Sequence, residues 1–252
     1  MASSKVHFKK NNDFKLLTSL DEKIKIFEEN KIDILYVIDF SLKFSKVSAY
    51  NFVKNILLDE LKTNCILIGY NNNFGKNRQG NIKYLEKNKN LFDIDIISIP
   101  KQSVDKISIS STKIREFLIN GKIGSANQLL GRKYSINGKI VRGNGIGRKI
   151  NFPTANIEIN EPKKLLPKNG VYAVEVILNN KTYLGMLNIG YNPTIKNEKK
   201  SIEVNIFKFS DEVYNNKILI NFIKRIRNEK KFKNLNELKK QLIIDKKKVK
   251  LI

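Results

Sequence analysis

Three glycines at alternate positions form the stretch best suited to hold a phosphate. Gly143, Gly145 and Gly147 are followed directly by Arg148. Glycines let backbone amides approach a phosphate closely, and an arginine adds positive charge. The stretch is not a dinucleotide-binding fingerprint, because the alternating residues after Pro153 predict a strand where that motif needs a helix. A glycine-rich hairpin turn is the alternative interpretation, and glycine spacing alone leaves both open.

Two oxygen-bearing side chains follow the glycine loop. Thr154 and Asn156 are two residues apart on the expected strand, so their side chains project from the same face. A hydroxyl and an amide oxygen are hard ligands suited to Mg²⁺, which keeps several waters and bridges substrate phosphates. The loop and this pair together predict a site for a nucleotide with magnesium.

A carboxylate on a second expected strand is the candidate general base. Within residues 201–207, Glu203 and Asn205 face one side, and the isoleucines and valine between them face the other. Glu203 is then placed to accept the proton of an attacking alcohol during phosphoryl transfer. The alternative is an ordinary carboxylate on a solvated sheet face, and context must separate the two.

These residues fall in a part of the chain that is rich in strand patterns. Turn signals such as Asn137-Gly138 and Asn179-Asn180 join the runs, which predicts an antiparallel sheet or barrel. Gly131 has the position of a helix C-cap, and Asn234 is placed to cap a final helix over 235–244. The expected strands cover residues 135–141, 154–159, 171–178, 182–189 and 202–207.

The preceding part alternates helix and strand patterns. A capping box at Ser19 and Glu22 predicts a helix, and Ser48 is placed to cap another. Apolar runs at 34–38, 65–68 and 94–99 predict strands of a parallel sheet, the first two buried on both faces. Two short helices are expected at 111–119 and 123–130. We therefore predict an α/β domain over residues 1–130 and a β-rich domain over 131–252.

Composition narrows the possible function classes. With one cysteine, Cys65, the chain can form no intrachain disulfide, which favours a reducing cytoplasm. No apolar run approaches the roughly 20 residues of a membrane span. The net charge of +24 suggests nucleic-acid binding, but the basic residues form no single stripe and no interleaved aromatics accompany them. Small-molecule substrates are the expected partners, and the sequence leaves the oligomeric state open.

From Gly131 onward the chain resembles the riboflavin kinase module of bacterial riboflavin kinase/FMN adenylyltransferase, also called FAD synthetase. The resemblance rests on the glycine loop leading into Phe-Pro-Thr-Ala-Asn at 152–156, which is highly specific, and on five further segments in the same order. They are residues 131–134, 170–173, 185–194, 202–204 and 222–232.

The resemblance implies a six-stranded antiparallel barrel with a C-terminal helix, and ATP, Mg²⁺ and riboflavin as ligands, with FMN as product. It places Thr154 and Asn156 at the Mg²⁺-bound phosphates of ATP and makes Glu203 the base toward the 5′-hydroxyl of the ribityl chain. It also implies flavin-binding residues on the segment after the last strand, namely Arg225, Arg227, Glu229 and Phe232.

The first part resembles the adenylyltransferase domain of the same family. Residues 109–115 match the family's Ile-Ser-Ser-Thr-x-Ile-Arg motif, in which hydroxyls and an arginine meet ATP phosphates at a helix start. Here these residues are Ser110, Ser111, Thr112 and Arg115. The family's two-histidine segment has no counterpart, since His7 is the single histidine of the chain. We therefore expect an adenylyltransferase-like domain that lacks its first strand and helix.

Three functions follow as hypotheses. The leading one is a riboflavin kinase with an incomplete adenylyltransferase-like domain. The second is a working bifunctional enzyme that also makes FAD through its surviving phosphate contacts. The third is a basic nucleic-acid-binding protein, which predicts no affinity for flavin.

Overall fold

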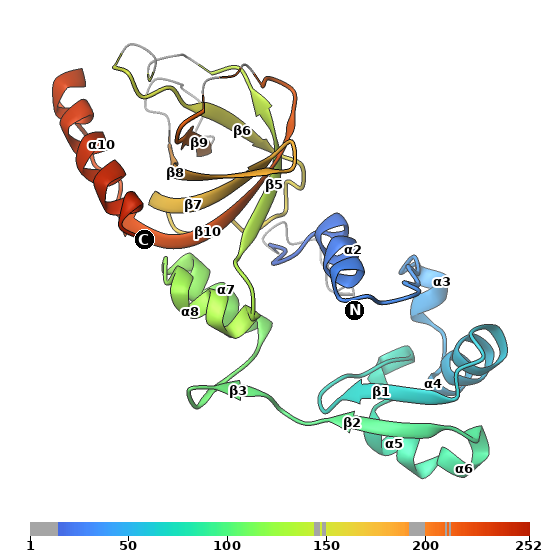
Figure 1. Ribbon diagram of the computed structural model, residues 1–252. Coiled ribbons are helices and arrows are strands. Elements are labelled where there is room, and N and C mark those ends of the chain that lie inside the picture. Colours follow the sequence, from blue (N-terminus) through green and yellow to red (C-terminus); the bar gives the residue numbers. More distant parts are fainter. Residues whose placement is uncertain (1–14, 144–146, 148–149, 192–199, 210, 212) are drawn as a thin grey trace. The chain divides into compact units, whose positions relative to one another are not determined.

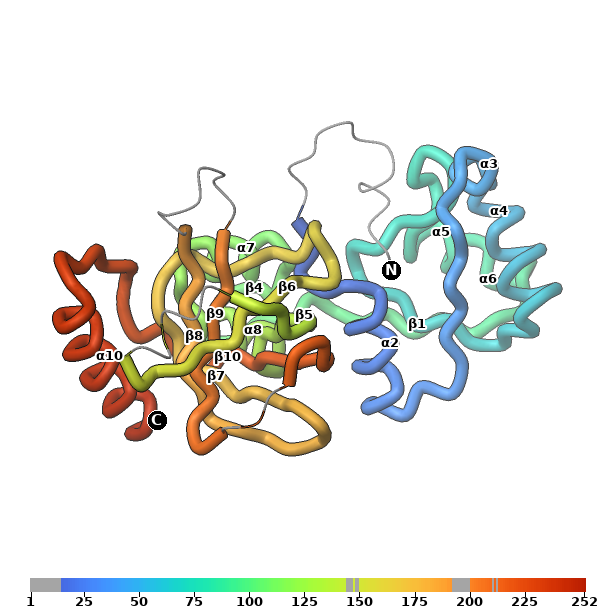
Figure 2. The backbone as a smooth tube through the Cα atoms, turned by 90° about the horizontal axis from the view of Figure 1, so that it is seen from above, coloured from blue at the N-terminus to red at the C-terminus, as the bar shows by residue number. Residues whose placement is uncertain are grey.

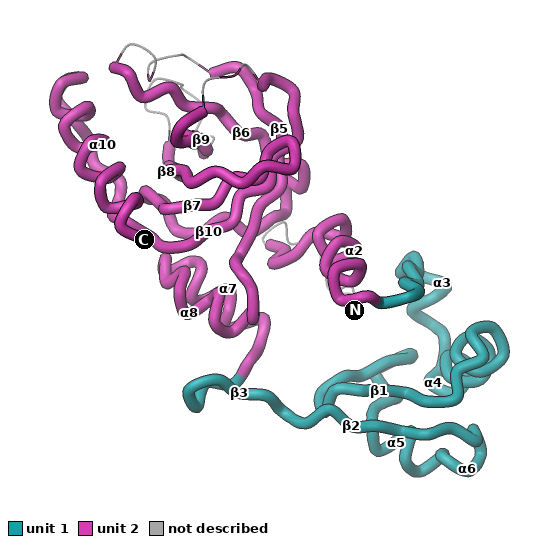
Figure 3. The backbone as a smooth tube through the Cα atoms, viewed as in Figure 1, with its two compact units in different colours: residues 1–13, 32–108 teal, residues 14–31, 109–252 magenta. Residues whose placement is uncertain are grey.

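The computed structural model describes residues 15–143, 147, 150–191, 200–209, 211 and 213–252 (Figure 1). The chain divides into two compact units, coloured separately in Figure 3. Unit 1 contains residues 32–108 together with residues 1–13, and unit 2 contains residues 14–31 and 109–252. The division by packing thus differs from the one at residue 130, because the segments 14–31 and 109–130 pack with the barrel that follows them.

Unit 2 is built on a closed barrel of six antiparallel strands. Its strands are β5 (Ser135–Val141), β6 (Ala155–Ile159), β7 (Gly170–Leu178), β8 (Lys181–Tyr191), β9 (Lys200–Ile206) and β10 (Lys217–Arg227). They follow one another around the barrel in the order β10-β5-β6-β9-β8-β7. This confirms the antiparallel barrel expected for the second half of the chain.

Large side chains fill the inside of the barrel. Tyr172 meets Phe222 edge to face with ring centroids 5.2 Å apart, and Tyr134 lies 6.2 Å from the same ring. All three side chains are fully buried. Offset and edge-to-face contacts between such rings stabilise a core beyond the area they bury. The barrel is therefore a packed framework, and the cavities described below lie at its outer face and at a mouth.

In the described part of unit 2, four helices lie around the barrel. They are α2 (Leu20–Glu29), α7 (Ser111–Ile119), α8 (Ile123–Leu130) and α10 (Leu235–Lys250). The view from above in Figure 2 shows α10 along the outside of the barrel, where it packs on β8 and β10. Asn127 of α8 joins its helix to the barrel, since it donates to the Phe222 carbonyl and accepts from the Tyr134 amide.

Unit 1 is an α/β unit with a two-stranded parallel sheet. Strand β1 (Cys65–Gly69) pairs with β2 (Asp95–Ile99), and a small core of Val53, Ile68, Leu85, Phe92 and Ile94 lies beside them. The remaining elements are α3 (Leu42–Ser45), α4 (Ala49–Asn51), the π-helix Phe52–Glu60, the 3₁₀ turn Lys76–Arg78, α5 (Ile82–Lys87), α6 (Lys89–Phe92), β3 (Ser103–Val104) and β4 (Ile107–Ser108). This confirms the parallel α/β class.

Local signals fixed several element ends as expected. Ser19 and Glu22 form both hydrogen bonds of the capping box, and the side chains of Ser48 and Asn234 cap their helices. Gly131 ends α8 in the left-handed conformation with φ 66°. Helix α10 is longer than expected, because it continues from residue 244 to Lys250.

Three expectations about local structure were wrong. The strand at 65–68 was expected to be buried on both faces, but Leu67 of β1 is 64% exposed. Residues 34–38 form no strand and are exposed, with Ile34 74% accessible. A strand needs a neighbour to satisfy its backbone, and in the described part of the chain β1 pairs only with β2. Asn137 and Gly138 are not a turn but lie inside β5, where a Cβ on Gly138 would approach the Glu158 carbonyl oxygen to 2.5 Å. The glycine there permits close strand packing, while Asn179 and Asn180 do form the tight β7–β8 turn with positive φ.

Candidate active site

The short pairing between β6 and β9 brings the predicted phosphate and base residues together. Only Ala155 and Asn156 of β6 pair with β9, and Asn156 lies opposite Glu203. Thr154 immediately precedes β6, and its hydroxyl donates to Glu203 Oε2 over 3.3 Å. The sheet register therefore gathers three residues that lie up to 49 positions apart in the sequence.

Two of the glycines lie against the same pair of side chains. A Cβ on Gly143 would come within 1.7 Å of Asn156 Nδ2, and one on Gly147 within 3.3 Å of Thr154 Oγ1 and 2.2 Å of the Phe152 carbonyl oxygen. At Gly147 the clash is with backbone, so no side chain fits there, whereas a side chain at Gly143 would require the Asn156 amide to move. The roles predicted for Gly145 and Arg148 fall outside the described residues.

A cavity of about 300 Å³ opens beside this cluster, under α10 and the outer face of β8, β9 and β10. Its polar lining consists of Thr154, Asn188, Ser201, Glu203, Asn205, Arg227, Glu229 and Lys230. Its apolar and aromatic lining comes from the loop before β6, from β7 and β8, and from α10 and the segment before it: Ile150, Phe152, Val171, Met186, Tyr191, Phe232, Leu238 and Leu242. An apolar chamber with a few convergent polar groups is the usual form of a small-molecule site.

Three of the four predicted flavin residues line this cavity. Arg227 donates through Nε to the fully buried Asp245 of α10 over 2.8 Å, and its guanidinium lies 5.9 Å from the centre of the Phe232 ring. Glu229 accepts from Asn169 over 3.0 Å, and a Cβ on Gly190 would collide with its carboxylate. These contacts hold charged groups and an aromatic ring at one end of the cavity.

Arg225, the fourth, is placed differently. Its guanidinium donates to the Asn169 carbonyl and to Asn228, and it stacks on Tyr172 at 5.9 Å. It is not among the residues that line the cavity. A β-bulge between Arg225 and Arg227 changes the direction of β10 between these two arginines. Arg225 therefore links the end of β10 to the residues before β7 and after β10.

A second cavity of about 290 Å³ shares Thr154 with the first. It lies at a mouth of the barrel and is lined by Ile140, Pro153, Thr154, Ala155, Val204, Ile206, Phe209, Asp211, Val213 and Tyr214. Arg142 stacks on Tyr214 at 5.4 Å beside it. Thr154 therefore stands between two chambers, one beside the general-base candidate and one lined by aromatic and apolar side chains.

The predicted adenylyl-phosphate residues stand at the start of α7 in unit 2. The Ser110 hydroxyl caps the helix by accepting from the Lys113 amide, and Ser111 and Thr112 are exposed. Arg115 donates to the Lys15 carbonyl over 3.2 Å, and burial lowers its pKa. The structure therefore uses Arg115 to hold the segment before α2, whereas the three hydroxyl residues remain open to solvent.

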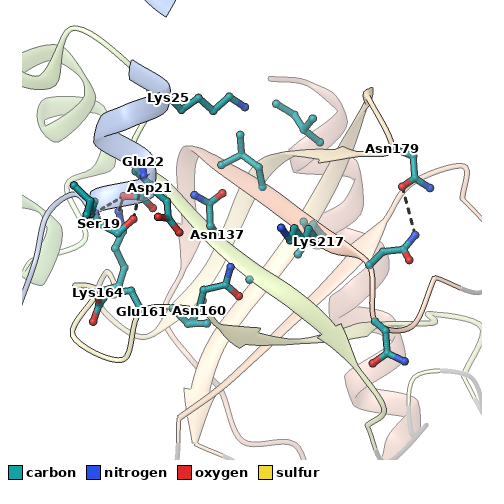
Figure 4. A pocket seen from close by; sticks show the side chains of 18 of the residues that line it. Ser19, Asp21, Glu22, Lys25, Asn137, Asn160, Glu161, Lys164, Asn179 and Lys217 are labelled. Carbon is teal, nitrogen blue, oxygen red and sulfur yellow. Dashed lines mark hydrogen bonds and ion pairs between the residues drawn. The ribbon is translucent and has the colours of Figure 1, made fainter. Parts of the chain in front are cut away.

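A third cavity, of about 790 Å³, contains none of the predicted site residues. It lies between α2 and the ends of β5, β6, β7 and β10, and asparagine amides dominate its lining (Figure 4). At its wall Lys164 donates to Glu22 and to the Leu17 carbonyl, with both charged side chains buried. Burial lowers the pKa of Lys164 to about 8. The predicted site residues therefore line the two smaller cavities and not this larger one.

Sequence reasoning missed most of the cavity lining. The alternation of the strand placed Asn205 on the same face as Glu203, but we assigned it no role. Its position on that face was the signal that could have predicted its place in the cavity lining. Asn188 lies opposite Glu203 on β8, and only the strand register reveals this. Leu238 and Leu242 come from α10, whose position no local pattern predicts.

Comparisons with known proteins decide the family. The Flavokinase family, described as riboflavin kinase, matches residues 130–252, and the FAD synthetase family matches residues 2–113. A bifunctional riboflavin kinase/FMN adenylyltransferase from Buchnera aphidicola subsp. Schizaphis graminum is 42% identical over 93% of this chain and 76% of its own length. The chain belongs to the bifunctional riboflavin kinase/FMN adenylyltransferase family.

A second relative and a solved structure are also similar to most of this chain. The protein of that name from Escherichia coli K12 is 34% identical over 91% of this chain and 73% of its own length. A crystal structure of a protein from Streptococcus pneumoniae named as a macrolide-efflux protein superposes with a TM-score of 0.88 at 30% identity, covering 98% of this chain and 80% of that one. In the described part of this chain, no helix has the length and hydrophobicity to span a membrane.

Membership of the family confirms the main expectation from sequence. The second half of the chain is a riboflavin kinase domain, for which the substrates are riboflavin and ATP. The residue roles stay predictions, because the comparisons name a family and an activity but no site residues.

Proposed function

We propose that unit 2 transfers the γ-phosphoryl group of ATP to the 5′-hydroxyl of riboflavin in the 300 Å³ cavity, with Glu203 as general base. The observation that carries this proposal is the cluster of Thr154, Asn156 and Glu203 at the β6–β9 junction. The Glu203 carboxylate accepts the proton as the hydroxyl oxygen attacks the γ-phosphorus. The bond to the β–γ bridging oxygen breaks, and ADP leaves with that oxygen.

Thr154 has two tasks in this mechanism. Its hydroxyl hydrogen is directed to Glu203, so it orients the carboxylate and leaves its oxygen lone pairs for a cation. With the amide oxygen of Asn156, it supplies the hard oxygen donors that suit Mg²⁺. In the described residues no group of three or more His, Cys, Asp or Glu side chains gathers to bind a metal, so phosphates and waters would complete the coordination. Bound Mg²⁺ would neutralise charge on the ATP phosphates.

The two cavities suit the two substrates. The apolar and aromatic walls around Phe232 fit a flat isoalloxazine ring, and Arg227, fixed by Asp245, supplies a positive charge at its edge. The chamber lined by Phe209 and Tyr214 fits the nucleotide, whose phosphates would then pass Thr154 under the glycine loop. Glu203 would lie between the ribityl chain and the γ-phosphate.

The direct test is incubation of the chain with riboflavin, ATP and Mg²⁺, followed by chromatography that separates riboflavin, FMN and FAD. We expect FMN and ADP in equal amounts and no FMN when Mg²⁺ is chelated. Titration of riboflavin fluorescence with protein and Mg·ADP separates this function from nucleic-acid binding, which predicts no quenching. Failure to form FMN under any of these conditions would reject the kinase proposal.

The magnesium site has its own test. Thr154→Ala or Asn156→Ala should abolish Mg²⁺-dependent ADP binding in calorimetry, because each removes one hard oxygen donor, while the unliganded protein keeps its stability. Thr182→Ala, on the exposed start of β8, is the matched control. Unchanged Mg·ADP affinity in both site variants would contradict the assignment.

Because the chain has one cysteine, we place this activity in the cytoplasm.

A further inference from the structure

The buried side-chain amide of Asn205, next to the general-base candidate, donates a hydrogen bond but accepts none in the described part of the chain. Asn205 lies two residues after Glu203 on β9, opposite Met186 of β8, and is 6% exposed. Its Nδ2 donates to the Pro153 carbonyl over 2.6 Å. Its Oδ1 is buried and has no hydrogen-bond partner in the described part of the chain. The residue lines the same cavity as Glu203.

The orientation of this amide is fixed by its neighbour. A carbonyl oxygen only accepts hydrogen bonds, so the atom facing Pro153 must be the NH₂ group and the other atom must be the acceptor. A buried acceptor left unpaired is costly, and natural proteins keep such groups mainly where a ligand or water satisfies them. Asn205 Oδ1 therefore has the capacity to accept a hydrogen bond from a ligand.

We propose that Asn205 is a substrate-positioning residue of the kinase: its Oδ1 accepts a hydrogen bond from a ribityl hydroxyl, and its Nδ2 holds the Pro153 carbonyl that precedes Thr154. The inference rests on the proposed function. Side chains two residues apart on one strand face are separated by about 7 Å, which a pentitol chain can span. The reacting hydroxyl at Glu203 and an inner hydroxyl at Asn205 would together set the direction of the chain. One side chain thus links the position of the alcohol to that of the phosphate-binding threonine.

The test pairs one substitution with changes in the substrate. Wild type, Asn205→Ala and the control Asn221→Ala are assayed with riboflavin and with riboflavins that each lack one inner ribityl hydroxyl. Asn221 lies on β10, away from both cavities near Thr154. For riboflavin, kcat/KM of Asn205→Ala should fall roughly 10- to 100-fold, and one deoxy substrate should cause a similar loss in wild type. That same deoxy substrate should cause no further loss in Asn205→Ala.

A second variant separates the two halves of the amide. Asn205→Asp keeps an acceptor for the hydroxyl but cannot donate to Pro153. We expect it to retain discrimination against the deoxy substrate while its Mg·ADP affinity falls. Circular dichroism of each variant against Asn221→Ala identifies any loss of fold, and Asn205→Asp keeps the proposal testable if Asn205→Ala does not fold.

The outcomes distinguish the two proposals. Equal losses with every deoxy substrate in wild type and Asn205→Ala would overturn the positioning role, since the amide would then act only as a support for Pro153. If wild type formed no FMN, the proposed function would fail. The same cycle of variants and substrates, measured as quenching of flavin fluorescence, would then still decide whether Asn205 contacts the ribityl chain.

Discussion

The two units of this molecule differ in how completely their strands are paired and buried. In unit 2 every barrel strand has two paired neighbours, since the sheet closes on itself. In unit 1 the parallel sheet of β1 and β2 stays open, with Leu67 64% and Ile97 51% exposed. The open edges of a sheet leave unpaired backbone groups and uncovered apolar side chains. Apolar strands are thus necessary for a buried sheet, but a complete set of neighbours decides whether burial occurs.

This difference matches the distribution of the predicted chemistry. A closed barrel holds its strands in a single register, and register is what brings Thr154, Asn156 and Glu203 together. In unit 1 the apolar residues 34–38 find no sheet position within the described chain. We therefore expect the kinase reaction to depend on the closed barrel of unit 2, which sets the spacing of its predicted site residues.

The largest effect is expected for removal of the predicted general base, Glu203, in unit 2. Glu203→Gln keeps the size of the side chain and its bond to Thr154 but cannot accept a proton. Turnover of riboflavin to FMN should fall roughly 10²–10⁴-fold with the fold intact. Steady-state kinetics check this, with Glu175→Gln on β7 as a control outside the cavity. Near wild-type kcat in Glu203→Gln would remove the base from the mechanism.

The next effect compares the two reactions of the family in one chain. We predict that this chain makes FMN but little FAD. Adenylyl transfer needs preorganised donors at the α-phosphate, and each such donor lost typically costs about 10²–10³-fold in kcat. The chain has a single histidine, and Arg115 is bonded to the Lys15 carbonyl. Prolonged incubation with FMN, ATP and Mg²⁺ decides the matter, and FAD formed as fast as by a family member with both histidines would contradict it.

These sites were predictable from sequence to the extent that they depend on local patterns. Alternation gave five of the six barrel strands, and capping residues gave the starts of α2 and α10. Strand β10 was missed although Ile218, Ile220 and Phe222 alternate, because basic residues at 217, 224, 225 and 227 bound this short apolar stretch. The strand expected at 34–38 was wrong because its burial depends on neighbours that no local window contains. Asn205 Oδ1 and the Arg227–Asp245 bond likewise needed the packing of separate elements.

A third prediction measures the difference between the units directly. In native-state hydrogen exchange, the amides of β1 and β2 should exchange faster than those of β7 and β8 by on the order of 10²-fold, or about 3 kcal/mol in opening free energy. The reason is that the open sheet loses its pairing by separation of one strand pair, whereas a barrel strand must break two. The barrel strands of the same molecule serve as the internal control. Equal protection in both sheets would show that closure does not set local stability here.

The smallest expected effect concerns the buried ion pair that joins α2 to the barrel. Burial lowers the pKa of Lys164 in the folded state to about 8, against 10.5 for an exposed lysine. Between these two values the unfolded chain binds more protons than the folded one, so this group makes unit 2 more stable as the pH rises. Its destabilising contribution is complete below pH 8 and disappears above pH 10.5. Between pH 8 and 9.5 the gain should be about 1 to 2 kcal/mol.

The matched control for this pH dependence removes both charges together. Glu22→Gln with Lys164→Met leaves no unpaired buried charge. The free energy of unfolding of unit 2 is then measured for both proteins by denaturant at pH 8 and 9.5. The two proteins differ only at Glu22 and Lys164, so the difference between their pH dependences reports on this buried pair. Parallel pH curves would mean that Lys164 titrates in the folded protein as it does in water, and that the charged pair adds no cost to the attachment of α2.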